Sequence, residues 1–230
     1  MEQGKAVRIL DAAEALLVGF GYRKVTVDDV ARRAGVGKGT VYLYWPSKKD
    51  LFATVLVRDS AALLAAELDV LRADPAEVQL HRALRRSFQE TMRRPLTRAL
   101  ATGDHEALGE LLTASKIGWQ FTVGKVETTA RYLAVLHRHG LLADDPVAEP
   151  ILTYRVSAAV TGSFLLDGMP GAADFSVADK AAALAETVRR AFEPDTEPTP
   201  AMLRAAAAEM TELYQQWLTE LADALPGESA

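Results

Sequence analysis

The segment GVGKGTVYLYW, from Gly35 to Trp45, brings together residue types that bind phosphate: closely spaced glycines and a lysine. Glycine lets backbone amides come close to an anion, and the lysine ammonium adds a positive charge. Two kinds of phosphate suit this chemistry, those of a bound nucleotide and those of a nucleic acid backbone. The elements that surround the segment decide between them.

The nucleotide interpretation requires a buried strand before the loop and a glycine five positions before the glycine that precedes the lysine. Arg32 occupies that position, and the preceding TVDDVARRA has its charged residues on one face of an amphipathic helix. No strand can be drawn there. A nucleotide-binding enzyme is therefore disfavoured, and the phosphates of a nucleic acid are favoured.

The whole chain of 230 residues shows apolar residues at steps of three and four, without a convincing alternating stretch. We therefore expect an all-α fold. Thr26 with Asp29 forms a capping-box pattern, Gly35 is suited to the turn that follows, and Pro46 ends the next helix. The expected helices cover residues 4–20, 27–34, 38–45, 48–72, 75–93, 104–114, 119–139, 147–167, 176–193 and 200–224.

The two short helices around Gly35 fit a steep pair joined by a turn. Ala31 is small where the helices approach, and Val41 and Trp45 return apolar side chains to a shared core. The other face of the second helix suits phosphate oxygens and base edges in a DNA major groove. That face carries Lys38, Thr40, Tyr42 and Tyr44. Tyr44 also suits a half-buried packing role.

The stretch TVDDVARRAGVGKGTVYLYWPSKKDLF, residues 26–52, resembles the helix-turn-helix signature of the TetR family of bacterial transcription regulators. The resemblance implies that residues 27–34 form the first helix of the motif and 38–44 the recognition helix. It also implies that Thr26 and Lys48 contact phosphates. The residues it places against DNA are Lys38, Gly39, Thr40, Tyr42 and Tyr44.

Two positions depart from the family pattern. Gly37 stands where a capping serine is usual, so one hydroxyl that could hold DNA is missing. Trp45 stands where phenylalanine is usual, which keeps an aromatic side chain in the core. The family further implies a homodimer whose recognition helices enter major grooves about 34–36 Å apart on a near-palindromic operator.

The resemblance divides the chain into a three-helix DNA-binding head at 1–52, a larger helical body at 53–193, and a linker with a C-terminal amphipathic helix at 194–230. The body is expected to bind a small-molecule effector and to form the dimer. Candidate effector-binding residues are Phe88, Met92, Trp119, Phe121 and Tyr132. Candidate dimer residues are Ile151, Leu152, Ala158, Ala159, Gly162 and Leu166. The C-terminal helix could cover the partner subunit or its own body.

Charge is unevenly distributed along the chain. Residues 1–60 contain ten Lys and Arg against seven Asp and Glu, and the other 170 contain 16 against 24, for a net charge of −5. A basic head on an acidic body suits a protein that presents one end to DNA. No apolar run is long enough to cross a bilayer and the N-terminus lacks a signal-peptide pattern, so a cytoplasmic protein is expected.

An enzymatic function lacks a converging set of catalytic groups. The four histidines do not share a helix face at metal-binding spacing, cysteine is absent, and the carboxylates form no recognisable pair. We therefore expect no cofactor, no metal and no catalysis. The favoured function is a ligand-responsive regulator, most simply a repressor. The alternative is an architectural DNA-binding protein without a ligand.

Overall fold

The computed structural model describes residues 3–102, 114–167, 169, 171 and 174–225, and every regular element within them is a helix. The expected all-α fold is confirmed. The helix expected at 104–114 lies almost entirely outside the described residues. Within the described chain, no helix has the length and apolar character to cross a bilayer.

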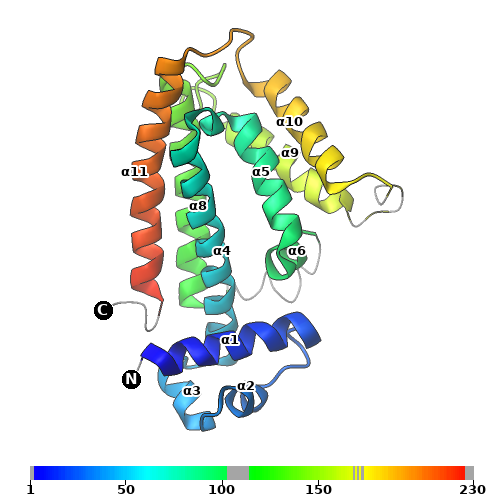
Figure 1. Ribbon diagram of the computed structural model, residues 1–230, viewed down its shortest axis with the longest axis vertical. Coiled ribbons are helices and arrows are strands. Elements are labelled where there is room, and N and C mark those ends of the chain that lie inside the picture. Colours follow the sequence, from blue (N-terminus) through cyan, green and yellow to red (C-terminus); the bar gives the residue numbers. More distant parts are fainter. Residues whose placement is uncertain (1–2, 103–113, 168, 170, 172–173, 226–230) are drawn as a thin grey trace.

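The head lies at one end of the molecule (Figure 1). It consists of α1 (Gln3–Phe20), α2 (Val27–Ala34), α3 (Lys38–Tyr44) and the first turns of α4 (Lys48–Ala73). One apolar cluster joins these four helices. Because α4 begins in the head cluster and continues far into the body, the boundary expected between residues 52 and 53 falls inside a continuous helix.

Local sequence signals account for the bounds of the short head helices. The Thr26 hydroxyl accepts a hydrogen bond from the Asp29 amide at 3.2 Å, and the Asp29 carboxylate accepts from the Thr26 amide at 3.0 Å. This capping box satisfies amides that the first turn of α2 leaves without partners. Gly35 ends α2 with φ of 67°, a left-handed conformation that glycine adopts without steric cost.

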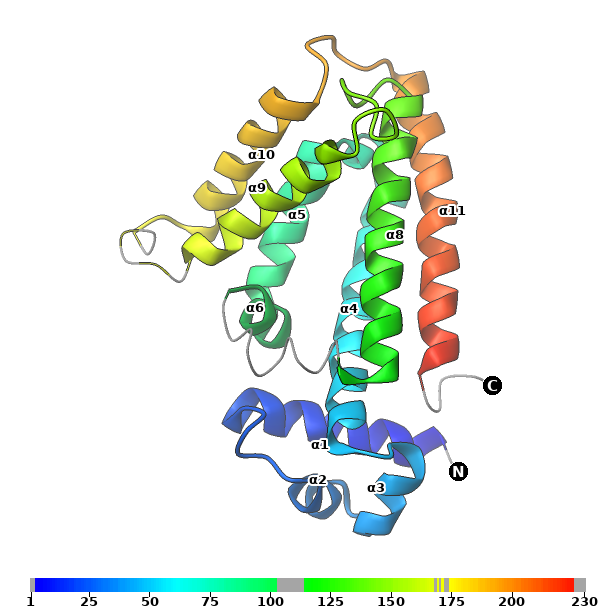
Figure 2. The ribbon, with the colours of Figure 1, turned by 180° about the vertical axis from the view of Figure 1, so that it is seen from behind.

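The body contains two groups of helices (Figures 1 and 2). The long helices α4, α8 and α11 run side by side along the molecule, and α5, α9 and α10 slant away from them. The remaining bounds are η1 (Pro75–Val78), α5 (Leu80–Arg93), α6 (Pro95–Thr102), α8 (Lys116–Arg138), α9 (Ile151–Asp167), α10 (Val177–Phe192) and α11 (Pro200–Ala224).

The helices of the body differ from the expected ones in two places. The helix expected at 75–93 is divided at Gln79 into the 3₁₀ turn η1 and α5. The break expected at the RRP sequence is present, since α5 ends at Arg93, but the short helix α6 that begins directly after it at Pro95 was not expected. Proline is tolerated in the first turn of a helix because its missing amide would have no partner there.

The C-terminal helix α11 packs against α4, η1 and α8 of its own body. Its Trp217 ring stacks on Phe121 of α8 with centroids 5.9 Å apart. Gly124 faces the same indole, since a Cβ at that position would lie 3.1 Å from Trp217 Nε1. The sequence left open whether the C-terminal helix covers the partner subunit or its own body. In the structure it packs on its own body.

Candidate functional site

The recognition helix α3 is held to the head by apolar side chains at its inner face. Val41 and Trp45 are almost fully buried, and the Trp45 indole donates a hydrogen bond from Nε1 to Thr54 Oγ1 at 3.0 Å. That bond ties α3 to α4, and the Thr54 hydroxyl in turn donates to the Asp50 carbonyl at 2.7 Å. The expected core role of Trp45 is confirmed, and the helix has little freedom to turn.

The outer face of α3 is open to solvent. Tyr42 is 43% exposed, and Lys38 and Gly39 are also exposed. A Cβ at Gly39 would meet no protein atom within 4 Å, so packing inside the chain does not require glycine there. The sequence analysis missed Leu43, which is 85% exposed beside Tyr42 and belongs to the same open surface.

Thr40 and Tyr44 are only half-exposed. The Tyr44 side chain packs against the head cluster, and its ring lies 5.5 Å from that of Trp45. The packing role that the sequence left open for Tyr44 is therefore present. Its contact with DNA, like the contacts of the other candidate residues, stays a prediction.

Lys38 forms an ion pair across the helix-turn-helix motif. Its Nζ lies 2.8 Å from Asp28 Oδ2, and both side chains are exposed. The hydrogen bond from the ammonium to Asp28 raises the pKa of Lys38, with a further Coulombic contribution from the same carboxylate. Lys38 is thus positively charged, and its ammonium is held in place by Asp28. A phosphate that binds Lys38 would compete with the Asp28 carboxylate.

Thr26 and Lys48, the two candidate phosphate contacts at the flanks, already serve internal roles. The Thr26 hydroxyl caps α2 and donates to Asp29 at 2.6 Å. The Lys48 ammonium donates to the Tyr22 carbonyl at 2.7 Å and lies 4.2 Å from the centre of the Tyr22 ring. Partial burial lowers the pKa of Lys48. Because an ammonium has three donors, two remain for other acceptors.

Gly37 is the N-cap of α3 and makes no side-chain cap. The Thr40 amide instead donates to the Gly37 carbonyl at 2.9 Å. A Cβ at Gly37 would have the Thr40 hydroxyl as its nearest neighbour at 3.9 Å, an ordinary contact distance. The backbone is therefore already in a capping conformation that a serine could adopt.

The same part of the chain matches a known family. Residues 9–55 match the family model described as "Bacterial regulatory proteins, tetR family". The match contains α2, α3 and the buried face of α1 in the geometry described above. The head of the chain is thus similar to TetR-family regulatory proteins.

Similarity to curated proteins extends beyond the head. The transcriptional repressor KstR from Mycolicibacterium smegmatis is 34% identical over 118 residues, which cover 48% of this chain and 57% of KstR. The chain spans between 30% and 57% of the length of the first curated relatives that it matches.

Two solved structures share the overall fold. A complex of SmeT with triclosan has a TM-score of 0.59 and 21% identity, covering 85% of this chain and 99% of SmeT. FadR from Bacillus subtilis in complex with stearoyl-CoA has a TM-score of 0.54 and 15% identity, covering 79% and 96%. At these identities the comparison concerns the fold alone.

The five candidate effector residues do not form one cluster. Phe88, Met92 and Tyr132 are buried in the same apolar core, where the Phe88 ring stacks on Phe164 at 4.8 Å. Phe121 is buried in a different cluster, with Trp217 of α11. Trp119 is 57% exposed.

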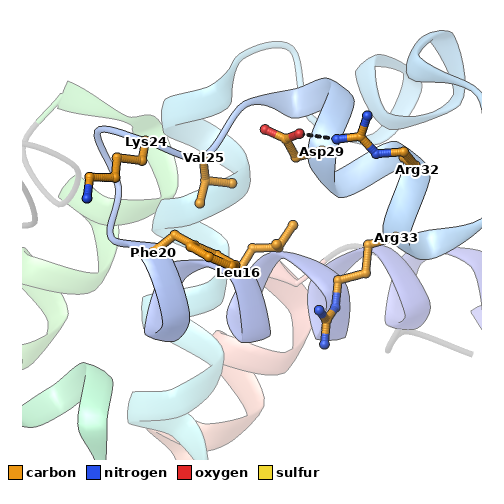
Figure 3. A pocket seen from close by; sticks show the side chains of 7 residues that line it. All are labelled: Leu16, Phe20, Lys24, Val25, Asp29, Arg32 and Arg33. Carbon is orange, nitrogen blue, oxygen red and sulfur yellow. Dashed lines mark hydrogen bonds and ion pairs between the residues drawn. The ribbon is translucent and has the colours of Figure 1, made fainter.

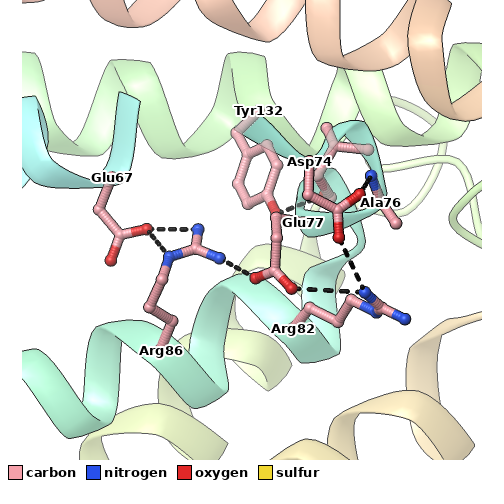
Figure 4. Close-up of polar contacts among 8 residues, drawn as sticks. Glu67, Asp74, Ala76, Glu77, Arg82, Arg86 and Tyr132 are labelled. Carbon is pink, nitrogen blue, oxygen red and sulfur yellow. Dashed lines mark hydrogen bonds and ion pairs between the residues drawn. The ribbon is translucent and has the colours of Figure 1, made fainter. Parts of the chain in front are cut away.

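A partly buried polar network lies beside Tyr132 (Figure 4). Arg86 of α5 donates from Nε to Glu67 of α4 at 2.6 Å and also pairs with Glu77 of η1. Burial raises the pKa of Glu67, and the Arg86 charge opposes that effect. Glu67 Oε1 is buried without a hydrogen-bond partner among the described residues. Three residues from three elements meet here, so no local pattern predicts the network.

The candidate dimer residues divide between two environments. Ile151, Ala158 and Leu166 are exposed on α9, and Ala159 and Gly162 are half-buried. Leu152 is fully buried in the chain's own core, so it is not part of the exposed surface of α9. Tyr154 and Leu165, which the sequence analysis did not select, add exposed apolar area to that helix.

Proposed function

We propose that this chain is a ligand-responsive transcriptional repressor that binds a near-palindromic DNA operator as a homodimer. The observation that carries the proposal is the orientation of α3. Val41 and Trp45 attach its inner side to the head, and its outer side presents Lys38, Gly39 and Tyr42 to solvent. A helix presented in this way suits a major groove, where side chains reach base edges. Such a protein would act in the bacterial cytoplasm, where the chromosome lies.

The head and body are connected in a way that supports control by a ligand. The single helix α4 contributes Phe52 and Val55 to the head cluster and Leu68 and Leu71 to the body. Leu96 of α6 is also buried in the head cluster. A ligand that shifts α4 or α6 in the body would therefore move the head, because packed helices shift as rigid elements.

The exposed apolar side of α9 supports dimerisation. Ile151, Tyr154 and Leu166 are large apolar side chains with more than half of their surface exposed. Contiguous apolar surface of this kind marks an interaction site in a folded protein. We infer that α9 with α10 pairs with the same helices of a second chain in an isologous interface.

The repressor assignment follows from the description of KstR, and the nature of the effector from the two solved complexes. SmeT was solved with triclosan and FadR with stearoyl-CoA. Triclosan is largely apolar, and stearoyl-CoA carries a long apolar acyl chain on a charged coenzyme A group. We propose that the effector here likewise has a large apolar part, held near Phe88, Met92 and Tyr132.

Fluorescence anisotropy with the DNA on either side of this chain's own gene tests the proposal. We expect saturable binding that weakens steeply with salt, because each neutralised phosphate contributes about 0.9 to the slope of log K against log salt concentration. Lys38→Ala should weaken binding and reduce that slope. Arg131→Ala, which removes an exposed positive charge from the body, is the matched control and should bind normally. Equal binding by both variants would contradict the proposed DNA-binding face.

Titration of the DNA complex with triclosan and with stearoyl-CoA tests the response to ligands. Release of the operator by either compound would support the repressor model. Retention of the operator at saturating ligand, together with measured binding of that ligand to the body, would contradict it and favour the architectural alternative.

A further inference from the structure

A groove lies in the head between α1 and α2 (Figure 3). It has a volume of about 390 Å³, within the roughly 300–1,000 Å³ typical of small-molecule sites. We call it the head groove. Its lining residues are Leu16, Phe20, Lys24, Val25, Asp29, Arg32 and Arg33.

The floor of the head groove is apolar. Leu16 and Val25 are buried beneath it, whereas Phe20 is 61% exposed at its edge. Figure 3 shows the Phe20 and Leu16 side chains side by side on α1, below Val25. A phenylalanine ring left largely in water gains free energy when an apolar partner covers it. The groove therefore offers apolar surface that the described residues do not cover.

The rim of the head groove is cationic. Lys24 lies at the loop end of the groove, and Arg32 and Arg33 project from α2 (Figure 3). Arg32 pairs with Asp29. Hydrogen bonds from Thr26 and the Arg32 charge lower the pKa of Asp29, so this carboxylate remains ionised at neutral pH. Three positive charges thus face one negative charge.

Two of those cations have no counter-ion among the residues that the structure describes. Lys24 and Arg33 are exposed, and neither has a hydrogen bond or ion pair within the described part of the chain. The groove thus combines an uncovered apolar floor with uncompensated positive charge at its rim. A neutral apolar ligand would leave the charges unused, and a cationic one would be repelled.

We propose that the head groove binds a small amphipathic carboxylate, with its apolar chain on Phe20, Leu16 and Val25 and its carboxylate paired with Lys24 or Arg33. A guanidinium can bind a carboxylate through two parallel hydrogen bonds, and a lysine supplies a point charge. The described residues that line the site all lie on α1, α2 and their connecting loop. The site is therefore separate from the effector site proposed in the body, and the two stand or fall independently.

The site would act directly on the DNA-binding head. Asp29 lines the groove and also holds both the amide and the hydroxyl of Thr26, the candidate phosphate contact at the start of α2. A ligand carboxylate that draws Arg32 away from Asp29 would remove a positive charge from beside the Thr26–Asp29 cap of α2. A ligand in the groove could thus alter operator affinity without any movement of the body.

Backbone NMR of the full-length ¹⁵N-labelled protein tests the proposal, with sodium decanoate as the probe. We expect saturable shifts of the amides of Phe20, Lys24, Val25 and Arg33. Decyltrimethylammonium, which has the same chain and the opposite charge, should not produce them. Phe20→Ser should weaken decanoate binding by about tenfold or more, the equivalent of burying part of one aromatic ring.

Further variants distinguish the contribution of the rim cations to decanoate binding from that of the apolar floor. The double variant Lys24→Gln/Arg33→Gln should also lose affinity for decanoate, whereas Val18→Ser, an exposed apolar position on α1 outside the groove lining, should not. All four positions are exposed, so the variants are expected to fold, which unfolding curves will verify. Decanoate shifts confined to the body would overturn the proposal, as would equal binding of the cationic probe or unchanged affinity of Phe20→Ser.

Discussion

Adjacent residues of α3 have opposite environments. Val41 is 1% exposed and Trp45 2%, whereas Tyr42 and Leu43 project into solvent. A seven-residue helix makes less than two full turns at 3.6 residues per turn, so each side chain is committed to one face. Substitutions on the two faces should consequently affect different properties.

Trp45→Ala and Tyr42→Ala should separate stability from DNA binding. Trp45→Ala empties a core position and removes the hydrogen bond to Thr54, so we expect a loss of about 3–5 kcal/mol in the free energy of unfolding. Tyr42→Ala should change that free energy by less than about 0.5 kcal/mol and weaken operator binding. Chemical denaturation and DNA anisotropy measure the two effects. Normal operator binding by Tyr42→Ala would show that the contact face is misassigned.

Gly37→Ser should restore a cap to α3. Because glycine is itself an acceptable N-cap, we expect a stability gain of only a few tenths of a kcal/mol. Operator binding should increase, since the new hydroxyl lies at the end of the recognition helix. Gly37→Ala is the matched control, because its Cβ also fits but cannot form a hydrogen bond. If the alanine variant binds DNA as tightly as the serine variant, the missing hydroxyl is not the relevant feature.

At the scale of elements, the bounds of the head helices follow from short-range signals. The Thr26 capping box and Gly35 each act within four residues and predicted α2, and in the structure Ser47 likewise caps the start of α4. Body elements were harder to delimit. The RRP sequence was interpreted only as the end of a helix, although Pro95 also begins α6, because proline is compatible with both a helix end and a helix start.

The packing of α11 on α8 predicts how a substitution at Gly124 changes stability. Gly124→Val should place methyl groups into the Trp217 indole and lower the free energy of unfolding by about 1–3 kcal/mol, as overpacked sites do. In a Trp217→Ala background the same substitution should lower the free energy of unfolding by less, because the indole that its methyl groups would meet is absent. Equal costs in both backgrounds, measured by denaturation, would show that the two helices do not pack as described.

At the scale of the whole molecule, α4 connects the two parts. Arg58 of α4 binds Asp11 at 2.8 Å and Glu14 at 2.6 Å, both on α1. Together with the buried Phe52, these contacts attach the head firmly to the first half of α4. In the proposed dimer, the orientation of each head would therefore follow the arrangement of the two bodies.

The double variant Ile151→Glu/Leu166→Glu should produce monomers. Charges on this exposed side of α9 would be costly to bury against a second chain, and they leave the chain's own core untouched. Operator affinity should fall as well, because a single head binds only one half-site. Analytical ultracentrifugation measures the assembly state. Val126→Glu on α8 is the control and should remain dimeric. A dimer that survives the double variant would place the interface elsewhere.

The sequence by itself determined the all-helical class, the helix-turn-helix motif and the inward position of Trp45. Each of these features depends on hydrophobic periodicity or on contacts between residues that are close in the sequence, so it can be recognised from the sequence alone. Only the tertiary structure decided that α11 covers its own body, that Leu152 faces inward, and that Glu67, Arg86 and Glu77 meet. The same is true of the head groove, whose rim and floor come from separate helices. Those features arise from contacts between helices that are far apart in the sequence. Which faces of those helices meet is set by how the helices pack in three dimensions.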